Sequence, residues 1–205
     1  MVTAGGKPLP ARFYARDTIG VARDLLGCIL ESRTGGERTA GRIVEVEAYV
    51  GPHDPAAHGY GNRITRRNER LFGPPATSYV YLIYGMHWCF NAVTESDGYP
   101  AAVLVRALEP LDGVAVMMQR RRVTDERRLC SGPARLCEAL GIDGSIDGTS
   151  LVEGPVRIMR PHHRRRFTVD AGPRVGISKA RSWPLRFVVR GSPSLSRRGP
   201  KGKGA

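Results

Sequence analysis

Apolar residues follow two different periods in the first quarter of the chain. After Asp17 they recur at helical spacing up to Gly27, at positions Ile19, Ala22, Leu25 and Leu26. An Asp before such a run and a Gly after it are common capping residues, so this segment predicts a short helix. Residues 28–32 and 41–49 read as strands around a turn at 34–36, which predicts a hairpin.

The rest of the chain predicts more strands than helices. Residues 79–84 and 88–94 are two strand-like runs that meet at Gly85. Further predicted strands are 101–107, 156–159, 174–177 and 185–190. One helical face consists of Leu111, Val114, Met117 and Met118. A second helix opens at Ser131 and Pro133, turns Leu136, Cys137 and Leu140 inward, and ends at Gly141.

These elements do not alternate regularly, which favours a single α+β domain over a doubly wound one. We expect the domain to span 11–196, between flexible termini at 1–10 and 197–205. From Gly191 onward the composition is rich in Ser, Gly, Pro and Arg, so we expect the chain to fray there. The polar loop 51–75 is long, and loops of that length inside a domain usually have a function.

Charge narrows the class of partner. The 205 residues carry a formal net charge of +13, with 32 Lys and Arg against 19 Asp and Glu. Such a field attracts polyanions, of which nucleic acid is the commonest. Only four of the 32 basic residues are lysines, and guanidinium groups form forked contacts with phosphate, although a GC-rich genome gives the same bias.

The four cysteines, Cys28, Cys89, Cys130 and Cys137, form no CxxC pair and have no close histidine. We therefore expect no zinc site and no other metal, and reduced thiols of an intracellular protein. We expect no signal peptide, because the first residues lack an apolar run, and no membrane span, because no apolar run approaches membrane-spanning length.

Two carboxylates stand out on the strand 41–49. Glu45 and Glu47 are two residues apart, so they project from the same face, and Tyr49 shares that face. Exposed strand carboxylates are the ordinary interpretation of such a pair. Here Ile43, Val44 and Val46 make the strand apolar, where an ionised carboxylate is costly unless it has a role. A carboxylate at a strand end, beside an aromatic ring and a loop, suits a general base.

Several other side chains are candidates only in combination. His58 alone is more often a loop histidine, and Tyr79 and Tyr81 alone are more often packing residues. Tyr84 differs, because an aromatic ring at a hairpin tip is an exposed apolar wedge of the kind that proteins insert into DNA. Asn91 and Arg106 are polar residues in apolar strands, and the charge of Arg106 requires an anionic partner.

The positions of the few lysines bear on the reaction mechanism. They are Lys7, Lys179, Lys201 and Lys203, and three of them fall in the expected termini. A Schiff-base nucleophile is therefore disfavoured, and the chemistry should use water. The basic run at 162–166 is most simply a solvated surface, or at best an auxiliary phosphate patch.

Six segments together resemble one known family, the alkyladenine (3-methyladenine) DNA glycosylases. In the family's order they read GRIVEVEAYVGPHDPAAH, TRRNERLF, SYVYLIYGMHWCFN, VLVRALEP, LCSGPARLCEALGI and PLRFVVRGSP, and they extend from about 11 to 196. The resemblance implies a curved antiparallel sheet, open and barrel-like as in the formyltransferase C-terminal domain, with short flanking helices and a protruding β-hairpin. It also implies a monomer acting on double-stranded DNA without a cofactor.

The resemblance also implies a reaction. The family flips an alkylated or deaminated purine out of the duplex and hydrolyses the bond between base and sugar, with no strand cleavage. The family's general base falls on Glu47, which would activate the attacking water, and the Arg near that water falls on Arg106. The base-stacking residues fall on Tyr49, His58 and Tyr81.

The remaining family positions fall on the predicted strands 79–84 and 88–94 and on the turn between them. Asn91 matches the pocket Asn that disfavours the guanine amino group, and Tyr84 matches the intercalating residue. Met86 would lean into the minor groove beside it. The chain departs from the family at His87, where Tyr is frequent, and at Leu71, where Met is frequent; the lesion range is therefore left open.

Two other functions remain to be weighed. A non-catalytic nucleic-acid-binding domain would use the same basic and aromatic surface. A sugar hydrolase would use Glu45 and Glu47 as its two carboxylates, but an Arg-rich surface suits a neutral glycan poorly.

Overall fold

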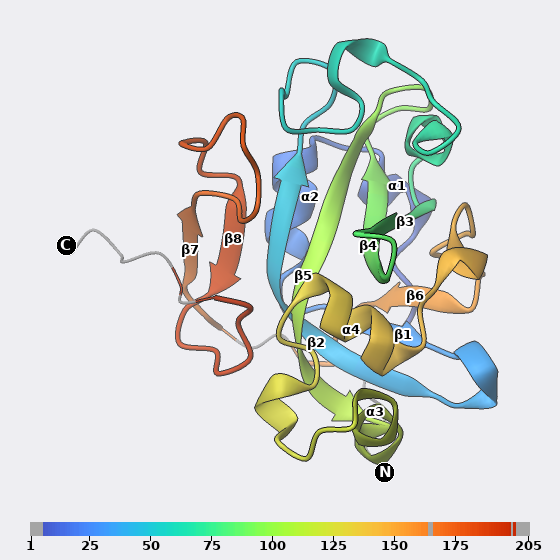
Figure 1. Cartoon of the computed structure of the whole chain (residues 1–205), viewed down its shortest axis with the longest axis vertical. Coiled ribbons are helices and arrows are strands. Elements are labelled where there is room, and N and C mark those ends of the chain that lie inside the picture. Colours follow the sequence, from blue (N-terminus) through green and yellow to red (C-terminus); the bar gives the residue numbers. More distant parts are fainter. Residues whose placement is uncertain (1–5, 164–165, 198, 200–205) are drawn as a thin grey trace.

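The computed structural model describes residues 6–163, 166–197 and 199. Within these residues the chain forms one eight-stranded sheet and four α-helices (Figure 1). The strands are β1 (Ile29–Ser32), β2 (Thr39–Tyr49), β3 (Ser78–Ile83), β4 (His87–Thr94), β5 (Ala101–Asp112), β6 (Val156–Met159), β7 (Val169–Gly172) and β8 (Arg186–Val189). The helices are α1 (Ala11–Tyr14), α2 (Thr18–Leu25), α3 (Val114–Arg121) and α4 (Pro133–Leu140).

Short 3₁₀ turns complete the described elements, at Thr34–Gly36, Tyr60–Asn62, Glu69–Phe72, Glu126–Arg128 and Gly144–Ile146. The predicted caps hold α2 and α4 in place. Asp17 accepts a hydrogen bond from the Gly20 N–H at 2.6 Å and so satisfies a free donor of the first turn of α2. Pro133 opens α4, and Gly141 ends it at φ 67°, a conformation that suits glycine.

The sheet is antiparallel, in the order β3-β4-β5-β2-β1-β6, with β8 and β7 attached to β2. The first half of β2 pairs with β1, and residues Glu45 to Glu47 pair with β8 on the same edge. The β2–β5 register shifts on both sides of Glu45, at the point where β2 changes partner. Such an irregularity bends a strand and re-aims its side chains, and it lies beside the two carboxylates.

The two faces of β2 have different surroundings. Val46 and Ala48 join the hydrophobic core with Val21 and Leu25 of α2, which lies behind the sheet in Figure 1. Glu45, Glu47 and Tyr49 alternate with them and face the other way, as predicted, on the side where α4 lies. Helix α2 therefore covers the core-facing side of this strand, while the other side keeps room for a site.

The predicted α+β class and antiparallel sheet are confirmed. The sheet is neither closed nor strongly curled, so the barrel-like curvature expected from the resemblance is not observed. The likeness to the formyltransferase C-terminal domain stays a prediction.

Two predicted elements were placed wrongly. Strand β5 continues to Asp112, because residues beyond Ala107 go on pairing with β2, and Leu111 lies on it instead of on a helix. Residues 174–177 are not a strand, and β7 precedes them. Instead of pairing with a neighbouring strand, the backbone N–H of Val175 donates a hydrogen bond to the carboxylate of Glu47.

Residues near both ends of the described chain contact the sheet, and the expected flexibility of 1–10 and 197–205 stays a prediction. Leu9 is buried, and its N–H is donated to the Ile158 carbonyl at 2.8 Å, so residues 6–10 pack against β6. After Gly191 the chain does not fray at once: Ser194 is buried, and Ser196 binds Glu45. The expectations for 1–5, 198 and 200–205 lie outside the described residues, as do two arginines of the basic run, at 164 and 165.

Candidate active site

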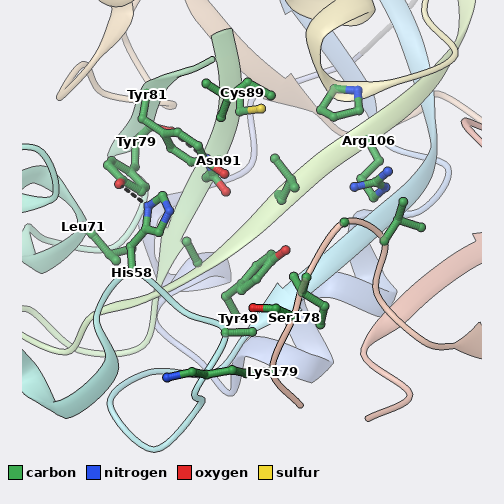
Figure 2. Close-up of a pocket in the computed structure, with 18 of the residues that line it drawn as sticks. Tyr49, His58, Leu71, Tyr79, Tyr81, Cys89, Asn91, Arg106, Ser178 and Lys179 are labelled. Atoms are coloured by element: carbon green, nitrogen blue, oxygen red, sulfur yellow. Dashed lines mark hydrogen bonds between the residues drawn. The ribbon is translucent and has the colours of Figure 1, made fainter. Parts of the chain in front are cut away.

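A cavity of about 510 Å³ opens on the face of the sheet that carries Tyr49. Its walls come from the end of β2, the loop after it, strands β3 to β5, and the segment 175–179 (Figure 2). The lining includes Tyr49, Ala56, His58, Leu71, Tyr79, Tyr81, Tyr84, Cys89, Asn91, Leu104, Arg106, Val175, Ser178 and Lys179. Segments more than 100 residues apart in sequence therefore form one concave surface.

Two aromatic walls face each other across this cavity. His58, Tyr79 and Tyr81 form one wall, and Figure 2 shows the ring of Tyr49 on the other side of the open space. The rings of His58 and Tyr81 lie 4.5 Å apart between centroids, too close to admit a base between them. A flat ring would therefore stack between this wall and Tyr49.

His58 is fixed in its wall by one hydrogen bond, between its Nδ1 and the Tyr79 hydroxyl at 2.7 Å. Desolvation by the surrounding protein, with a smaller contribution from the Arg67 charge, holds the pKa of His58 below its ordinary value. At neutral pH the imidazole is therefore uncharged, and it presents a neutral ring to whatever enters the cavity.

Asn91 lies on β4 between the aromatic wall and β5. Its side-chain amide donates to the Tyr79 carbonyl at 3.0 Å, and the residue is almost fully buried. This anchor fixes the plane of the amide, so its remaining groups meet the cavity in one orientation.

Glu47 lies directly behind the cavity wall and has no exposed surface. Its Oε1 accepts the Val175 N–H at 2.7 Å, and its Oε2 accepts the Tyr49 hydroxyl at 2.9 Å. Arg106 Nη1 lies 3.3 Å from the same Oε2. All three partners line the cavity, so the carboxylate is one residue layer from the space where a ligand would sit.

Glu45 is held more tightly and on the far side of Arg106. Its Oε1 accepts from Arg106 Nε and Arg186 Nε, each at 2.8 Å, and from the Ser196 hydroxyl at 2.6 Å. The Ser196 N–H is donated to Oε2 at 2.7 Å. Of these partners only Arg106 lines the cavity, so Arg106 separates Glu45 from it, which counts against a sugar hydrolase with two catalytic carboxylates.

The pKa values of Glu45 and Glu47 are shifted in opposite directions. Burial raises the pKa of Glu47, and the hydrogen bonds and the Arg106 charge offset this only in part. Burial opposes ionisation of Glu45 too, but Arg106, Ser196 and Arg186 together hold its pKa below the ordinary value. Groups whose surroundings separate their pKa values in this way are typical of sites of proton transfer.

The β3–β4 hairpin carries Tyr84 and Met86 at its tip, beside the mouth of the cavity. Tyr84 is 88% exposed and Met86 69%, which are the largest exposures among the large apolar side chains described. Tyr84 has φ 51° and Gly85 φ 68°, and the turn closes through the Met86 N–H and the Ile83 carbonyl at 3.1 Å. His87, also exposed, begins β4.

The structure brings together all the residues predicted for the pocket: Glu47 and Arg106, and the base-pocket candidates Tyr49, His58, Tyr81 and Asn91. Tyr84 lines the rim, while Met86 and His87 stand farther out on the hairpin and are not in the lining. The roles assigned to them stay predictions, because the arrangement alone does not test them.

Sequence reasoning missed a second set of polar groups around the site. They are the side chains of Asp54, Arg174, Arg186 and Ser196 and the backbone N–H of Val175. One signal was present, since Arg186 stands in an apolar strand just as Arg106 does. Asp54 and Arg174 gave no such signal, because their contact spans 120 positions. The four cysteines are buried thiols, and burial raises the pKa of Cys89 to about 11, so its thiol is protonated in the cavity.

The described residues lack two kinds of feature. They contain no group of three or more His, Cys, Asp or Glu placed to hold a metal ion. Within the same ranges, every helix is too short or too polar to cross a bilayer.

Comparison with known proteins identifies the family. The model of the family "Methylpurine-DNA glycosylase (MPG)" matches residues 12–193. A protein of Methanoculleus marisnigri is 50% identical over 193 residues, covering 93% of this chain and 99% of its own, and one of Nitrosospira multiformis is 46% identical over 92% and 93%. Both are named "Putative 3-methyladenine DNA glycosylase", as is a Bacillus cereus protein at 43% identity. The chain belongs to the methylpurine-DNA glycosylase family.

Proposed function

We propose that this protein is a monofunctional DNA glycosylase of base excision repair, which flips alkylated purines out of duplex DNA and hydrolyses their N-glycosidic bond. The observation that carries the proposal is a buried carboxylate with a raised pKa, Glu47, directly behind a cavity with two aromatic walls. Family membership supports the substrate class.

A flipped purine would stack between Tyr49 and the wall of His58 and Tyr81. Many alkylated purines carry a positive charge, and an aromatic face attracts such a ring by roughly 0.5–2 kcal/mol. The neutral imidazole of His58 does not repel the cation. The amide of Asn91, fixed by Tyr79, would meet the edge of the base and oppose a bulkier exocyclic group.

Hydrolysis needs one water between Glu47 and the anomeric carbon of the flipped nucleotide. The 3.3 Å contact of Glu47 Oε2 with Arg106 is the longest that the carboxylate makes, and a water can replace it. The water oxygen bonds to the anomeric carbon, its proton passes to Glu47, and the glycosidic electron pair leaves with the base. A cationic base departs neutral, so one general base contributing about 10²–10⁴-fold is a large share of the catalysis.

Tyr84 would fill the gap that the flipped nucleotide leaves, with Met86 and His87 beside it in the groove. Because every residue assigned here comes from one chain, a monomer suffices. The assignment favours an enzyme over a non-catalytic DNA-binding domain, since a binder has no use for a buried carboxylate behind its stacking surface.

The test is base release from defined duplexes, each containing one 3-methyladenine, 7-methylguanine or hypoxanthine. The protein should release free base and leave the strand intact until alkali is added. Intact duplexes after prolonged incubation would contradict the proposal, and strand cleavage without alkali would contradict the monofunctional assignment.

A further inference from the structure

A fully buried ion pair lies behind the stacking wall and has no place in the reaction described above. The side chains of Asp54 and Arg174 have no exposed surface. Arg174 Nη1 donates to Asp54 Oδ2 at 2.5 Å, and Nη2 donates to Oδ1 at 2.8 Å. This is a bidentate fork, the geometry in which a guanidinium best fixes direction as well as distance.

Arg174 also makes two contacts at the end of β2. Its Nη1 donates to the Ala48 carbonyl at 3.0 Å, and its guanidinium carbon lies 4.6 Å from the centroid of the Tyr49 ring. The guanidinium therefore packs against the ring that forms one wall of the cavity. Its planar fork cannot move relative to Asp54 without moving Tyr49.

Both oxygens of Glu47 are bound by groups adjacent to Arg174. The Tyr49 hydroxyl, on the ring that the guanidinium packs against, binds Oε2. The N–H of Val175, the next residue in the chain, binds Oε1. The placement of Arg174 thus sets the two hydrogen bonds that orient the carboxylate.

Asp54 connects the same pair to the opposite wall. Its carboxylate accepts the N–H groups of Val50 at 3.3 Å and Ala56 at 3.0 Å, and its carbonyl accepts the Ala57 N–H at 2.9 Å. These bonds shape the loop that delivers His58. The pair thereby ties together three parts of the site: the stacking ring, the carboxylate and the histidine loop.

The cost of burying the Asp54–Arg174 ion pair indicates that the pair does more than stabilise the fold. Two charges removed from water lose hydration that their attraction only partly restores, and well-packed apolar side chains of similar volume are often as stable or more so. Arg174 Nε is buried, and no partner was found for it among the described residues, which adds to the cost. A chain under selection for stability alone would gain little from this pair.

We propose that Arg174, held by Asp54, is a positioning residue for base excision: it fixes the Tyr49 ring and the Val175 N–H, and through them the orientation of Glu47. The inference rests on the proposed function of the cavity. It assigns Arg174 no contact with the substrate.

The decisive variant replaces both members, Asp54→Leu with Arg174→Met, which removes the charges together and keeps the site filled. We expect this variant to stay folded by thermal denaturation, while single-turnover excision of a 3-methyladenine duplex falls about 10²-fold, as small misplacements in an active site do. The acid limb of its pH profile should move to higher pH, because Glu47 loses hydrogen bonds that lower its pKa. A purely structural role would not move that limb.

Arg174→Lys and Arg38→Met are measured in parallel. Lysine keeps the charge but cannot form the fork, so we expect a folded protein with a similar loss of excision. Arg38 pairs with Glu31 and Asp112 at the start of β2, outside the cavity, and its variant should excise at the wild-type rate.

Three results would overturn the inference. A folded double variant, or a folded Arg174→Lys, with wild-type rate and pH profile would show that the pair positions nothing. Unfolding of every variant at Asp54 and Arg174 would make it a folding determinant only. An inactive wild-type protein would instead contradict the proposed function itself, so the two failures are distinguishable.

Discussion

At the scale of single residues, the site depends on how differently two neighbouring glutamates are surrounded. Glu45 and Glu47 share a face of β2, but Glu45 has two guanidinium groups and a serine, whereas Glu47 has a tyrosine hydroxyl, a backbone N–H and a more distant share of Arg106. One is held as a permanent anion, and the other can gain and lose a proton. This asymmetry favours Glu47 over Glu45 as the general base.

The raised pKa of Glu47 predicts the pH dependence of excision. Glu47 must be ionised to accept a proton, so the rate should fall as pH drops through its pKa, which burial places above the 4.5 of an ordinary Glu. The acid limb of single-turnover excision should therefore lie above that value for a cationic lesion. A rate that stays constant down to the ordinary value would argue against Glu47 as the base.

Residue patterns predicted the members of the site that are unusual for their local context, and missed those that are not. Glu47 and Arg106 are charges in apolar strands, and Tyr84 is an aromatic residue at a turn, so each shows its peculiarity in the sequence. Asp54 in a polar loop and Arg174 in an Arg-rich segment look ordinary. Their importance comes from a contact across 120 positions, which no local pattern records.

At the scale of elements, the β3–β4 hairpin presents an apolar tip on a turn that only some residues tolerate. Tyr84 adopts φ 51°, a left-handed conformation that is uncommon for a residue other than glycine and that asparagine accepts readily. A side chain held there at a steric cost, and almost fully exposed, is expected to have a role outside the fold.

We expect Tyr84→Asn to remove the wedge while preserving the turn. Excision from a fully paired duplex should fall at least about 10-fold, because unstacking a base costs a few kcal/mol that the wedge offsets. Excision of a lesion opposite a gap, where the base is already unstacked, should fall much less. The comparison of the two substrates is the measurement, and equal losses would count against a wedge.

The segment after β8 contributes to the surroundings of the site, because Ser196 donates two hydrogen bonds to Glu45. We expect Ser196→Ala to lower the free energy of unfolding by about 1–3 kcal/mol, since a buried carboxylate loses a hydrogen bond. Chemical denaturation measures this. Ser145→Ala, at an exposed serine, is the matched control and should change it by less than about 0.5 kcal/mol. Equal stabilities of the two variants would contradict this role of Ser196.

Elements with strong local signals were predicted well, and those set by distant contacts were not. Asp17, Pro133 and Gly141 gave the ends of α2 and α4 because capping is local chemistry. The extension of β5 to Asp112 depends on pairing with β2, and the irregular path of 174–177 depends on Glu47 and Asp54. Composition likewise failed for the segment after Gly191, where one serine finds a buried carboxylate.

At the scale of the whole molecule, the charge of +13 sets how the protein meets its substrate. Arg63 and Arg67 are exposed and line a smaller hollow that shares His58 with the cavity, and Lys179 lies in the cavity lining. Basic groups thus surround the opening through which a flipped nucleotide would enter. Phosphate contacts made there release condensed counterions, which makes affinity depend steeply on salt.

We expect duplex affinity to fall on the order of 10³-fold between about 50 and 200 mM salt, as for proteins with about six phosphate contacts. Fluorescence anisotropy across a salt series measures the slope. Arg63→Gln should reduce that slope by about one contact. An affinity that does not change with salt would contradict a DNA-binding surface at this opening.

Replacement of the proposed general base, Glu47→Gln, shows whether this side chain activates the hydrolytic water. The amide keeps the size of the side chain but cannot accept the proton. Binding of a 3-methyladenine duplex and single-turnover base release should be measured on the same preparation. We expect Glu47→Gln to bind the duplex as the wild type does and to release base about 10²–10⁴-fold more slowly. Base release at the wild-type rate would contradict this expectation.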